Sequence, residues 1–177
     1  STNNYKKALA SLDKLPNKDV NLKTAYQLIS FNQGVKHFQN SNFPAAITSF
    51  KLVDKYPVDP VLSGKAAYWT ADANYRLKNY DKAISGFKTF TFLPATLAPD
   101  LKAEAHYNIG YSYLQKEELP KAIEAFRIYV DEPNAKKKKK ADGFMRVADS
   151  YYVLKENEQA IKYYQEVLNL KSGYEDQ

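Results

Sequence analysis

The chain has 177 residues, of which 44% are apolar and 14% aromatic, and this composition is sufficient to bury a sizeable core. It contains no cysteine, which excludes disulfides, thiolate chemistry and cysteine-ligated metals, and its apolar stretches are interrupted too often to predict a transmembrane segment. The formal charge of +6 depends on one run from Lys136 to Lys140, without which the 26 basic residues fall to 21 against 20 acidic ones.

One motif recurs through the chain: an alanine, an aliphatic residue, two variable residues and then a large apolar residue. Its copies begin at evenly spaced alanines, namely Ala8, Ala46, Ala83, Ala122 and Ala160. The spacings of 38, 37, 39 and 38 residues amount to a fixed period, which indicates a helical repeat protein. Around one copy, Phe43, Ile47 and Phe50 lie at i, i+4 and i+7, so they predict an apolar stripe on one helix face.

In chain order, the sequence predicts one unpaired helix followed by four helix pairs, nine helices in all. The unpaired helix forms a half repeat over 3–16, and the full repeats cover about 25–58, 63–97, 102–134 and 140–171. In each full repeat the first helix carries a small residue, at Gly34, Ala71, Gly110 and Ala148, and the second helix carries the alanine motif. Because the half repeat leaves an apolar face without its partner, we expect a single repeat array that is a fragment of a longer protein.

The segment from Ala103 to Leu114, followed by the motif at Ala122 and by Pro133, resembles the tetratricopeptide-repeat consensus. The resemblance covers nearly the whole chain and implies an all-α fold, a right-handed α-solenoid of helix pairs with an open concave face. The period exceeds the standard unit of about 34 residues, and the extra residues fall between repeats. Such spacing looks like that of bacterial cell-envelope assembly proteins, which favours an envelope or periplasmic location but leaves the compartment open.

The family usually places a glycine between the two helices of a repeat, and this chain does not. The corresponding positions hold Ser41, Lys78, Glu117 and Lys155. Asn42, Asn79 and Asn157 lie near three of these positions, and asparagine tolerates the left-handed conformation that the turn requires. We therefore expect the turn to be retained.

The resemblance places the first helices on the concave face, and matching each repeat to the consensus assigns the inner positions. These positions are rich in aromatic side chains and comprise Phe31, Val35, Phe38, Tyr68, Asp72, Tyr75, Tyr107, Tyr111, Met145, Asp149 and Tyr152. Tyrosine combines apolar area with a hydrogen-bonding tip, so we hypothesise a groove for a peptide or protein partner, in which Asp72 and Asp149 favour a basic residue. The alternative is that the tyrosines pack on the neighbouring repeat.

The run from Lys136 to Lys140 opens a predicted first helix, where positive charge is unfavourable against the helix dipole. We therefore expect the run to fray or to stay solvated. The alternative is weak, salt-sensitive binding of nucleic acid or acidic surfaces through these lysines. No recognition motif accompanies the run, so no specific nucleic-acid binding is predicted.

The sequence contains no arrangement typical of an enzyme. The two histidines, His37 and His106, lie in different repeats at positions where the family has structural residues, and no phosphate-loop, metalloprotease or nucleophile-elbow motif occurs. We predict a non-enzymatic interaction scaffold without cofactor or metal. The alternative is an architectural spacer within a larger envelope or assembly protein. A truncated apolar end also allows end-to-end self-association.

Overall fold

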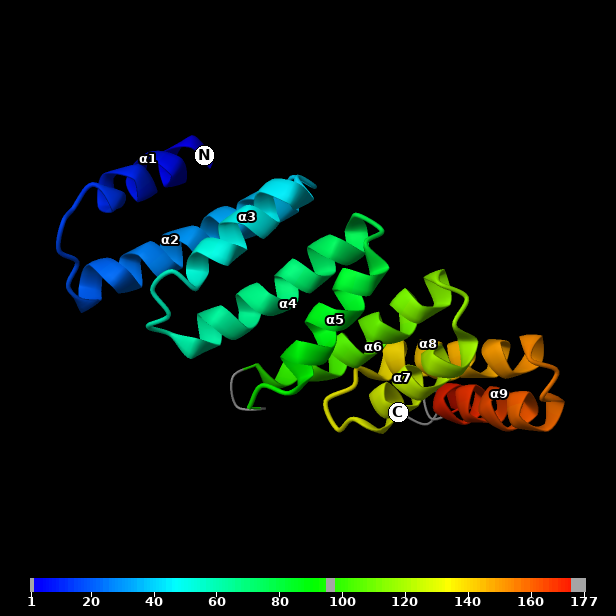
Figure 1. Cartoon of the computed structure of the whole chain (residues 1–177). Helices are drawn as coiled ribbons and strands as arrows, with labels where there is room; N and C mark the ends of the chain where they lie inside the picture. The colour runs from blue at the N-terminus through cyan, green and yellow to red at the C-terminus, as the bar shows by residue number, and fades with distance from the viewer. Residues whose placement is uncertain (1, 95–97, 173–177) are drawn as a thin grey trace. The chain divides into compact units, whose positions relative to one another are not determined.

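The computed structural model describes residues 2–94 and 98–172, and within these ranges the backbone forms nine α-helices and no strand (Figure 1). The all-α prediction is confirmed for this part of the chain. By its internal contacts the chain divides into two compact units, Ser1–Ala98 (unit 1) and Pro99–Gln177 (unit 2). The expectation of one continuous array stays a prediction, and the expected end of the second repeat, at residue 97, lies outside the described residues.

In the described part of unit 1, each helix packs against the next one in the sequence. The helices are α1 (Thr2–Asp13), α2 (Val20–Gln39), α3 (Phe43–Val53), α4 (Pro60–Arg76) and α5 (Tyr80–Thr91). Carboxylates fix two of the helix starts: Asp19 accepts a hydrogen bond from the Leu22 N–H at 2.9 Å, and Asp59 accepts one from the Val61 N–H at 2.8 Å. Helix α2 also contacts α4, so the first helices of two successive pairs lie against each other.

A buried glutamine holds α2 against the start of α4, a contact that the sequence analysis did not predict. The Gln27 side-chain amide donates a hydrogen bond to the Asp59 carbonyl at 2.9 Å and accepts one from the Asp59 N–H at 2.7 Å. Gln27 has no exposed surface, so its amide needs these bonds within the protein. The amide thereby satisfies two backbone groups of the segment that joins successive pairs.

Unit 2 repeats the same plan in two helix pairs. Its described helices are α6 (Pro99–Gln115), α7 (Leu119–Asp131), α8 (Lys137–Val153) and α9 (Asn157–Ser172). Helix α6 packs on α7, α7 on α8, and α8 on α9. The first helices of the two pairs, α6 and α8, are therefore linked through α7, and the side chains described below connect them directly.

The recurring alanine and aromatic residue of the second helices form the core of both units. The buried members of this set are Ala46, Ala83, Ala122, Ala160, Phe50, Phe87 and Phe126, whereas Tyr164, at the same position of the last copy, is half-buried. Small residues on the first helices make room for the rings: a Cβ added at Gly34 would lie 2.5 Å from the Phe50 ring, and one added at Gly110 would lie 2.8 Å from the Phe126 ring. Each buried ring contributes about 1.5–3 kcal/mol to folding.

The predicted left-handed turn is present in every full pair, although glycine is absent from it. Ser41, Lys78, Glu117 and Lys155 have φ values of 57°, 60°, 59° and 62°. Hydrogen bonds back to the preceding helix hold this conformation, as the Lys78 N–H donates to the Tyr75 carbonyl at 2.9 Å. A left-handed non-glycine residue costs about 1–2 kcal/mol, so the four turns retain a conformation that their side chains disfavour.

Candidate functional site

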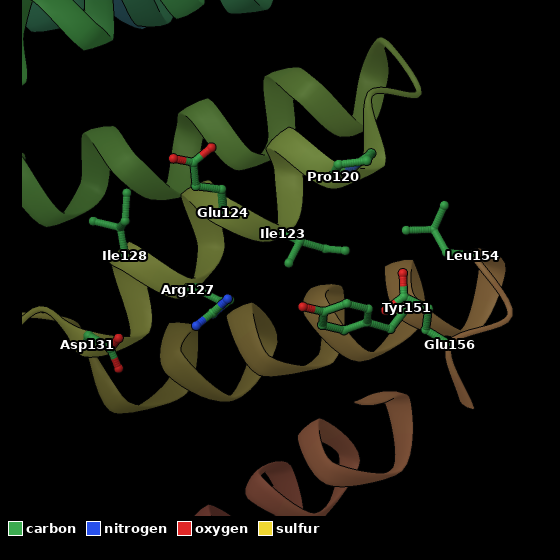
Figure 2. Close-up of a pocket in the computed structure, with 9 residues that line it drawn as sticks. All are labelled: Pro120, Ile123, Glu124, Arg127, Ile128, Asp131, Tyr151, Leu154 and Glu156. Atoms are coloured by element: carbon green, nitrogen blue, oxygen red, sulfur yellow. The ribbon is translucent and has the colours of Figure 1, made fainter. Parts of the chain in front are cut away.

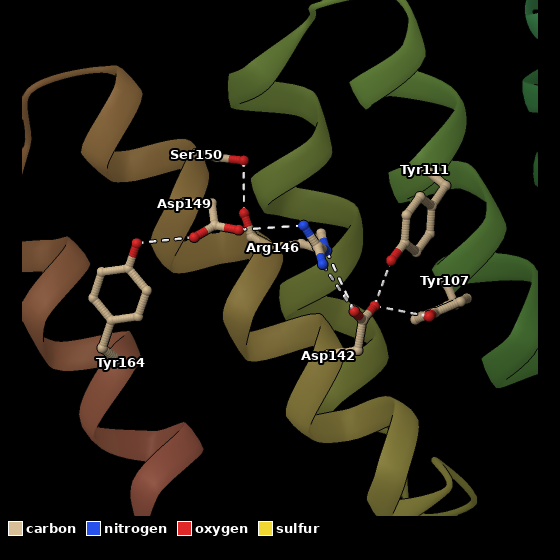
Figure 3. A network of polar contacts seen from close by, with 7 residues as sticks. All are labelled: Tyr107, Tyr111, Asp142, Arg146, Asp149, Ser150 and Tyr164. Atoms are coloured by element: carbon tan, nitrogen blue, oxygen red, sulfur yellow. Dashed lines mark hydrogen bonds and ion pairs between the residues drawn. The ribbon is translucent and has the colours of Figure 1, made fainter.

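Two tyrosines of α6 and one aspartate of α8 meet on the surface of unit 2. Tyr107 and Tyr111 lie one helical turn apart, and both hydroxyls donate hydrogen bonds to the same Asp142 oxygen, at 2.8 and 2.5 Å (Figure 3). The rings contact each other with centroids 4.9 Å apart. These bonds join the first helices of two successive pairs across more than 30 residues of sequence.

The arginine of the next turn of α8 extends this cluster toward α9. The Arg146 guanidinium donates to Asp142 Oδ1 at 3.2 Å and to Asp149 Oδ2 at 3.2 Å, and the Tyr164 hydroxyl donates to Asp149 Oδ1 at 2.9 Å (Figure 3). We call this set the Asp142 network: Tyr107, Tyr111, Asp142, Arg146, Asp149 and Tyr164. It fixes side chains from three helices in one arrangement.

Electrostatics keep the Asp142 carboxylate and the Arg146 guanidinium of the network ionised. Burial alone would raise the pKa of the Asp142 carboxyl, but hydrogen bonds from Tyr111 and Tyr107 and the charge of Arg146 outweigh it, so the pKa is lowered. Burial, together with hydrogen bonding to the carboxylate, raises the pKa of the Tyr107 and Tyr111 hydroxyls. Both tyrosines therefore remain neutral donors at physiological pH.

The lysine run adjoins the Asp142 network, and the expectation that it frays or stays solvated is wrong for part of it. Helix α8 begins at Lys137, so most of the run is helical. The Lys139 ammonium pairs with the buried carboxylate of Glu104 and lies 4.9 Å from the Tyr107 ring centroid. Lys136 approaches the same carboxylate at 3.7 Å. A partner on α6 thus compensates charge that the dipole of α8 disfavours.

The predicted binding residues of unit 2 share one surface, which we call the α6/α8 face. It consists of Tyr107, Tyr111, Asp142, Met145, Arg146, Asp149 and Tyr152. Met145, Asp149 and Tyr152 follow Asp142 at helical spacing, so the α8 members lie on one side of that helix. Tyr152 is 64% exposed, and Met145 is half-buried. The face therefore combines fixed polar groups with accessible apolar surface.

The predicted binding residues of unit 1 are mainly engaged in packing. Tyr68 is only 5% exposed, and its ring contacts Phe87 and Phe90, both at 5.4 Å between centroids. Asp72 is also buried and pairs with Arg76 at 3.2 Å. The Tyr68 ring therefore packs in the core of unit 1, in place of the predicted position on an open binding face.

The remaining aromatic positions of unit 1 are partly exposed but also contact other rings. Phe31 lies 5.8 Å from Phe50, Phe38 lies 5.0 Å from Trp69, and Val35 belongs to the same cluster. Tyr75 lies 5.8 Å from Tyr80, which begins α5. These side chains have no polar network comparable to that around Asp142 in the contacts described.

A groove on a different side of unit 2 lies beside α7. It has a volume of about 490 Å³ and is lined by Pro120, Ile123, Glu124, Arg127, Ile128, Asp131, Tyr151, Leu154 and Glu156 (Figure 2). At about 100° per residue, Tyr151 lies roughly opposite Asp142 around α8. The Tyr151 ring is fixed by stacking on Tyr163 at 5.6 Å. We call this cavity the α7 groove; it is separate from the α6/α8 face.

Among the described residues, no group of three or more His, Asp or Glu side chains is arranged to hold a metal ion. Within residues 2–94 and 98–172, no helix has the length and apolar character needed to cross a membrane.

His106 lies 3.9 Å from Glu132 in a half-buried position, where burial lowers the pKa of its imidazole.

Comparison with known families identifies the repeat. Two family models, both described as tetratricopeptide repeat, match the sequence, one over residues 31–88 and 92–137 and the other over residues 142–170. The chain belongs to the tetratricopeptide-repeat family. Members of this family are in general protein-interaction modules, which agrees with the non-enzymatic prediction at that level.

Several solved structures share this fold. A crystal structure of MamA has a TM-score of 0.74 and 20% identity over 99% of this chain and 90% of that chain. BtubC (BKLC) from P. vanneervenii has a TM-score of 0.73 and 13% identity over 97% of this chain and 72% of that chain. The Rap conjugation gene regulator of the plasmid pLS20, in complex with the Phr* peptide, has a TM-score of 0.58 and 18% identity over 99% of this chain and 49% of that chain. No curated protein sequence matched the chain.

The sequence analysis did not select four residues that make the polar contacts of this surface. Three of them, Asp142, Arg146 and Tyr164, belong to the Asp142 network, and the fourth, Glu104, pairs with the lysine run. The signal for two of them was available, because Asp142 and Arg146 have the i, i+4 spacing of a helical ion pair. The contacts of Glu104 with the lysine run cross between helix pairs, and spacing within one helix carries no information about them.

Proposed function

We propose that this chain is a non-enzymatic interaction module that binds a peptide or protein partner on the α6/α8 face of unit 2. The observation that carries the proposal is the Asp142 network, in which polar groups of three helices are held in one geometry at a partly exposed surface. Groups that are already ordered lose little conformational entropy when a ligand binds, so their contacts are converted efficiently into affinity.

The network still has hydrogen-bonding capacity for a ligand. Tyr107 and Tyr111 each use their O–H donor on Asp142, and their oxygens retain acceptor capacity. The side chains of Arg146 and Asp149 are 36% and 42% exposed, so both can be reached from solvent. Tyr152 and Met145 add apolar area beside these groups, a combination that favours peptide recognition.

Fold similarity supports the proposal at a coarser level. The Rap regulator shares the fold at a TM-score of 0.58, and its structure was determined with a bound peptide. The same kind of helix arrangement is therefore compatible with peptide binding. The position of the binding face in this chain rests on the Asp142 network and not on that similarity.

The test uses peptides selected by phage display on the purified chain. Affinities of the selected peptides are measured by calorimetry for the wild type and for two matched double variants. Met145→Ala/Tyr152→Ala removes accessible side chains from the α6/α8 face without touching the hydrogen bonds of the Asp142 network. Ile128→Ala/Leu154→Ala removes two partly exposed apolar side chains, 41% and 37% exposed, from the α7 groove.

We expect the first variant to weaken binding at least about tenfold, as loss of contacts worth about 1.4 kcal/mol would do, and the second to change it less than about twofold. Circular dichroism is used to check that both variants remain helical. The opposite pattern would place binding at the α7 groove and overturn the proposal. Failure to select any peptide would favour an architectural spacer.

A further inference from the structure

We propose that unit 1 contains a second binding site, a cleft between α1, α2 and α3 that takes the backbone of a short, uncharged peptide segment. The cleft has a volume of about 500 Å³, within the range typical of ligand pockets. We call it the α1 cleft, and its lining includes Leu9, Ala10, Gln33, Ala45, Ser49 and Leu52. The inference concerns unit 1 and does not depend on the function proposed for the α6/α8 face.

Two polar side chains in the α1 cleft are buried without a hydrogen-bond partner. Gln33 of α2 is 8% exposed, and Ser49 of α3 is 4% exposed. Neither side chain forms a hydrogen bond with another residue in the described part of the chain. Buried amides and hydroxyls are nearly always hydrogen-bonded, so the unused capacity of these two groups points to a ligand that supplies the missing partners.

The corresponding positions of the last repeat hold apolar and aromatic side chains. When positions are matched by their distance from the motif alanines, Val147 corresponds to Gln33 and Tyr163 to Ser49. Val147 is fully buried, and the Tyr163 ring stacks on Tyr151 at 5.6 Å between centroids. The repeat therefore does not require polar side chains at these two positions, and their presence in the first full repeat needs another explanation.

The first full repeat also lacks a ring that the last repeat has. Ser30 lies one turn from Gln33 on the same side of α2 and corresponds to Phe144, whose ring lies 6.2 Å from that of Tyr163. The Ser30 hydroxyl is buried and has no hydrogen-bond partner. Two packed rings of the last repeat are thus replaced by serines in the first, and the lost side-chain volume contributes to the α1 cleft.

A second glutamine of α2 shows which ligand group suits a buried side-chain amide. The Gln27 amide donates to the carbonyl of Asp59 at 2.9 Å and accepts from the N–H of the same residue at 2.7 Å. Gln33 carries the same donor and acceptor and lines the α1 cleft with them unpaired. A peptide residue that enters the cleft offers one N–H and one carbonyl, so it can satisfy Gln33 in the way that Asp59 satisfies Gln27.

The rest of the lining indicates the character of the bound residue. Aliphatic side chains of α1 and α3 form part of the walls, at Leu9, Ala10, Ala45 and Leu52. They favour an aliphatic side chain on the ligand. Lys55 and Asp13 also line the cleft, but they pair with each other at 2.6 Å, so they do not call for a charged ligand.

The experiment uses N-acetyl-leucine N-methylamide, a minimal peptide segment with one aliphatic side chain. Binding to the isotope-labelled chain is followed by NMR through the side-chain NH₂ signals of the glutamines. Gln33→Met removes the amide at nearly unchanged shape, and its spectrum identifies the Gln33 signals. Gln39→Met is the matched control, because Gln39 is an exposed glutamine at the end of the same helix.

We expect the Gln33 signals to shift with a dissociation constant of about 1 mM, as a ligand of this size gives at ordinary efficiency. Gln33→Met should weaken binding at least about fivefold, and Gln39→Met should change it less than about twofold. Because Gln33→Met removes an unpaired buried amide, it should not lower the urea midpoint of the free chain. The Met145→Ala/Tyr152→Ala variant should bind the probe like the wild type, which separates this site from the α6/α8 face.

Three results would overturn the proposal. The first is the absence of any shift of the Gln33 signals at about 20 mM probe, well above the expected dissociation constant, which would leave the two side chains to water alone. The second is binding that Gln33→Met does not weaken. The third is tighter binding of free glutamine or free leucine than of the blocked leucine, which would assign the cleft to a small amino acid in place of a peptide segment.

Discussion

The hydrogen bond between Tyr111 and Asp142 provides the sharpest test of the Asp142 network. Tyr111→Phe removes only the hydroxyl that donates to the Asp142 carboxylate at 2.5 Å. A hydrogen bond to a charged group contributes about 1.5–3 kcal/mol, and since the Asp142 side chain is 29% exposed we expect the lower end, about 1.5 kcal/mol. Asp142→Asn weakens the hydrogen bonds from both tyrosines and the partly exposed ion pair with Arg146, so the free energy of unfolding should fall by about 2–3 kcal/mol.

In a double-mutant cycle, the variant that carries both Tyr111→Phe and Asp142→Asn should lose less unfolding free energy than the two single variants lose together. Once residue 142 is neutral, the hydrogen bond of the Tyr111 hydroxyl is weaker, so its removal costs less. The coupling energy between the two positions should be about 1 kcal/mol. A suitable control is Tyr151→Phe, because the Tyr151 hydroxyl has no hydrogen bond in the structure described and the stacked ring is retained. This control should change stability by less than about 0.5 kcal/mol.

The assay must report on unit 2 separately. The single tryptophan of the chain, Trp69, lies in α4 of unit 1, so its fluorescence does not follow the opening of α6 and α8. Amide hydrogen exchange measured by mass spectrometry on peptides from α6 and α8 gives the opening free energy of these helices, in which tenfold faster exchange corresponds to about 1.4 kcal/mol. Additive effects of the two substitutions, with coupling below about 0.3 kcal/mol, would refute the claim that this hydroxyl and this carboxylate stabilise each other.

Three further predictions concern the fold. Lys78→Gly should stabilise the chain by about 0.5–1 kcal/mol in urea denaturation, because φ is 60° there, whereas Lys82→Gly within α5 should destabilise it by about 1 kcal/mol. Gly110→Ala should lower stability by about 1–3 kcal/mol, against the usual benefit of alanine in a helix, since the added Cβ would lie 2.8 Å from the Phe126 ring. Because burial lowers the pKa of His106 in the folded state, the unfolded chain binds more protons, and stability should fall as the pH drops below about 6.5; His106→Gln should flatten this dependence.

The features that could be predicted from the sequence are those set within one helix or one turn. The alanine and aromatic positions recur with the helical period, so burial of Ala122 and Phe126 followed from pattern alone. The left-handed conformation at Lys155 was predicted from the resemblance to the repeat consensus, which has glycine at this position. Contacts between helix pairs were not predictable in this way, because Glu104 and Lys139 are 35 residues apart.

The candidate site shows the same limit: the sequence predicted which helix face each residue lies on, but not which side chains are exposed. Matching to the repeat consensus selected Tyr107 and Tyr111, which do lie together, but it also selected Tyr68, whose ring is covered by two phenylalanines of α5. Equivalent positions in a repeat have equivalent backbones, whereas their exposure depends on the size of the side chains on the neighbouring helix. Consensus matching therefore assigns a direction to each side chain and leaves its accessibility undetermined.

The Asp142 network stabilises unit 2 and is also the proposed recognition surface, and this double role decides which variants are informative. Replacement of Tyr107 or Tyr111 by alanine would remove ring contacts with the buried Phe126 as well as the hydroxyl, so lost binding could reflect lost structure. Met145 and Tyr152 lie on the same side of α8 and take no part in the network's hydrogen bonds. A binding defect confined to these two positions, with exchange in α6 and α8 unchanged, would separate recognition from stability, and an equal defect with faster exchange would show that the face acts only through the fold.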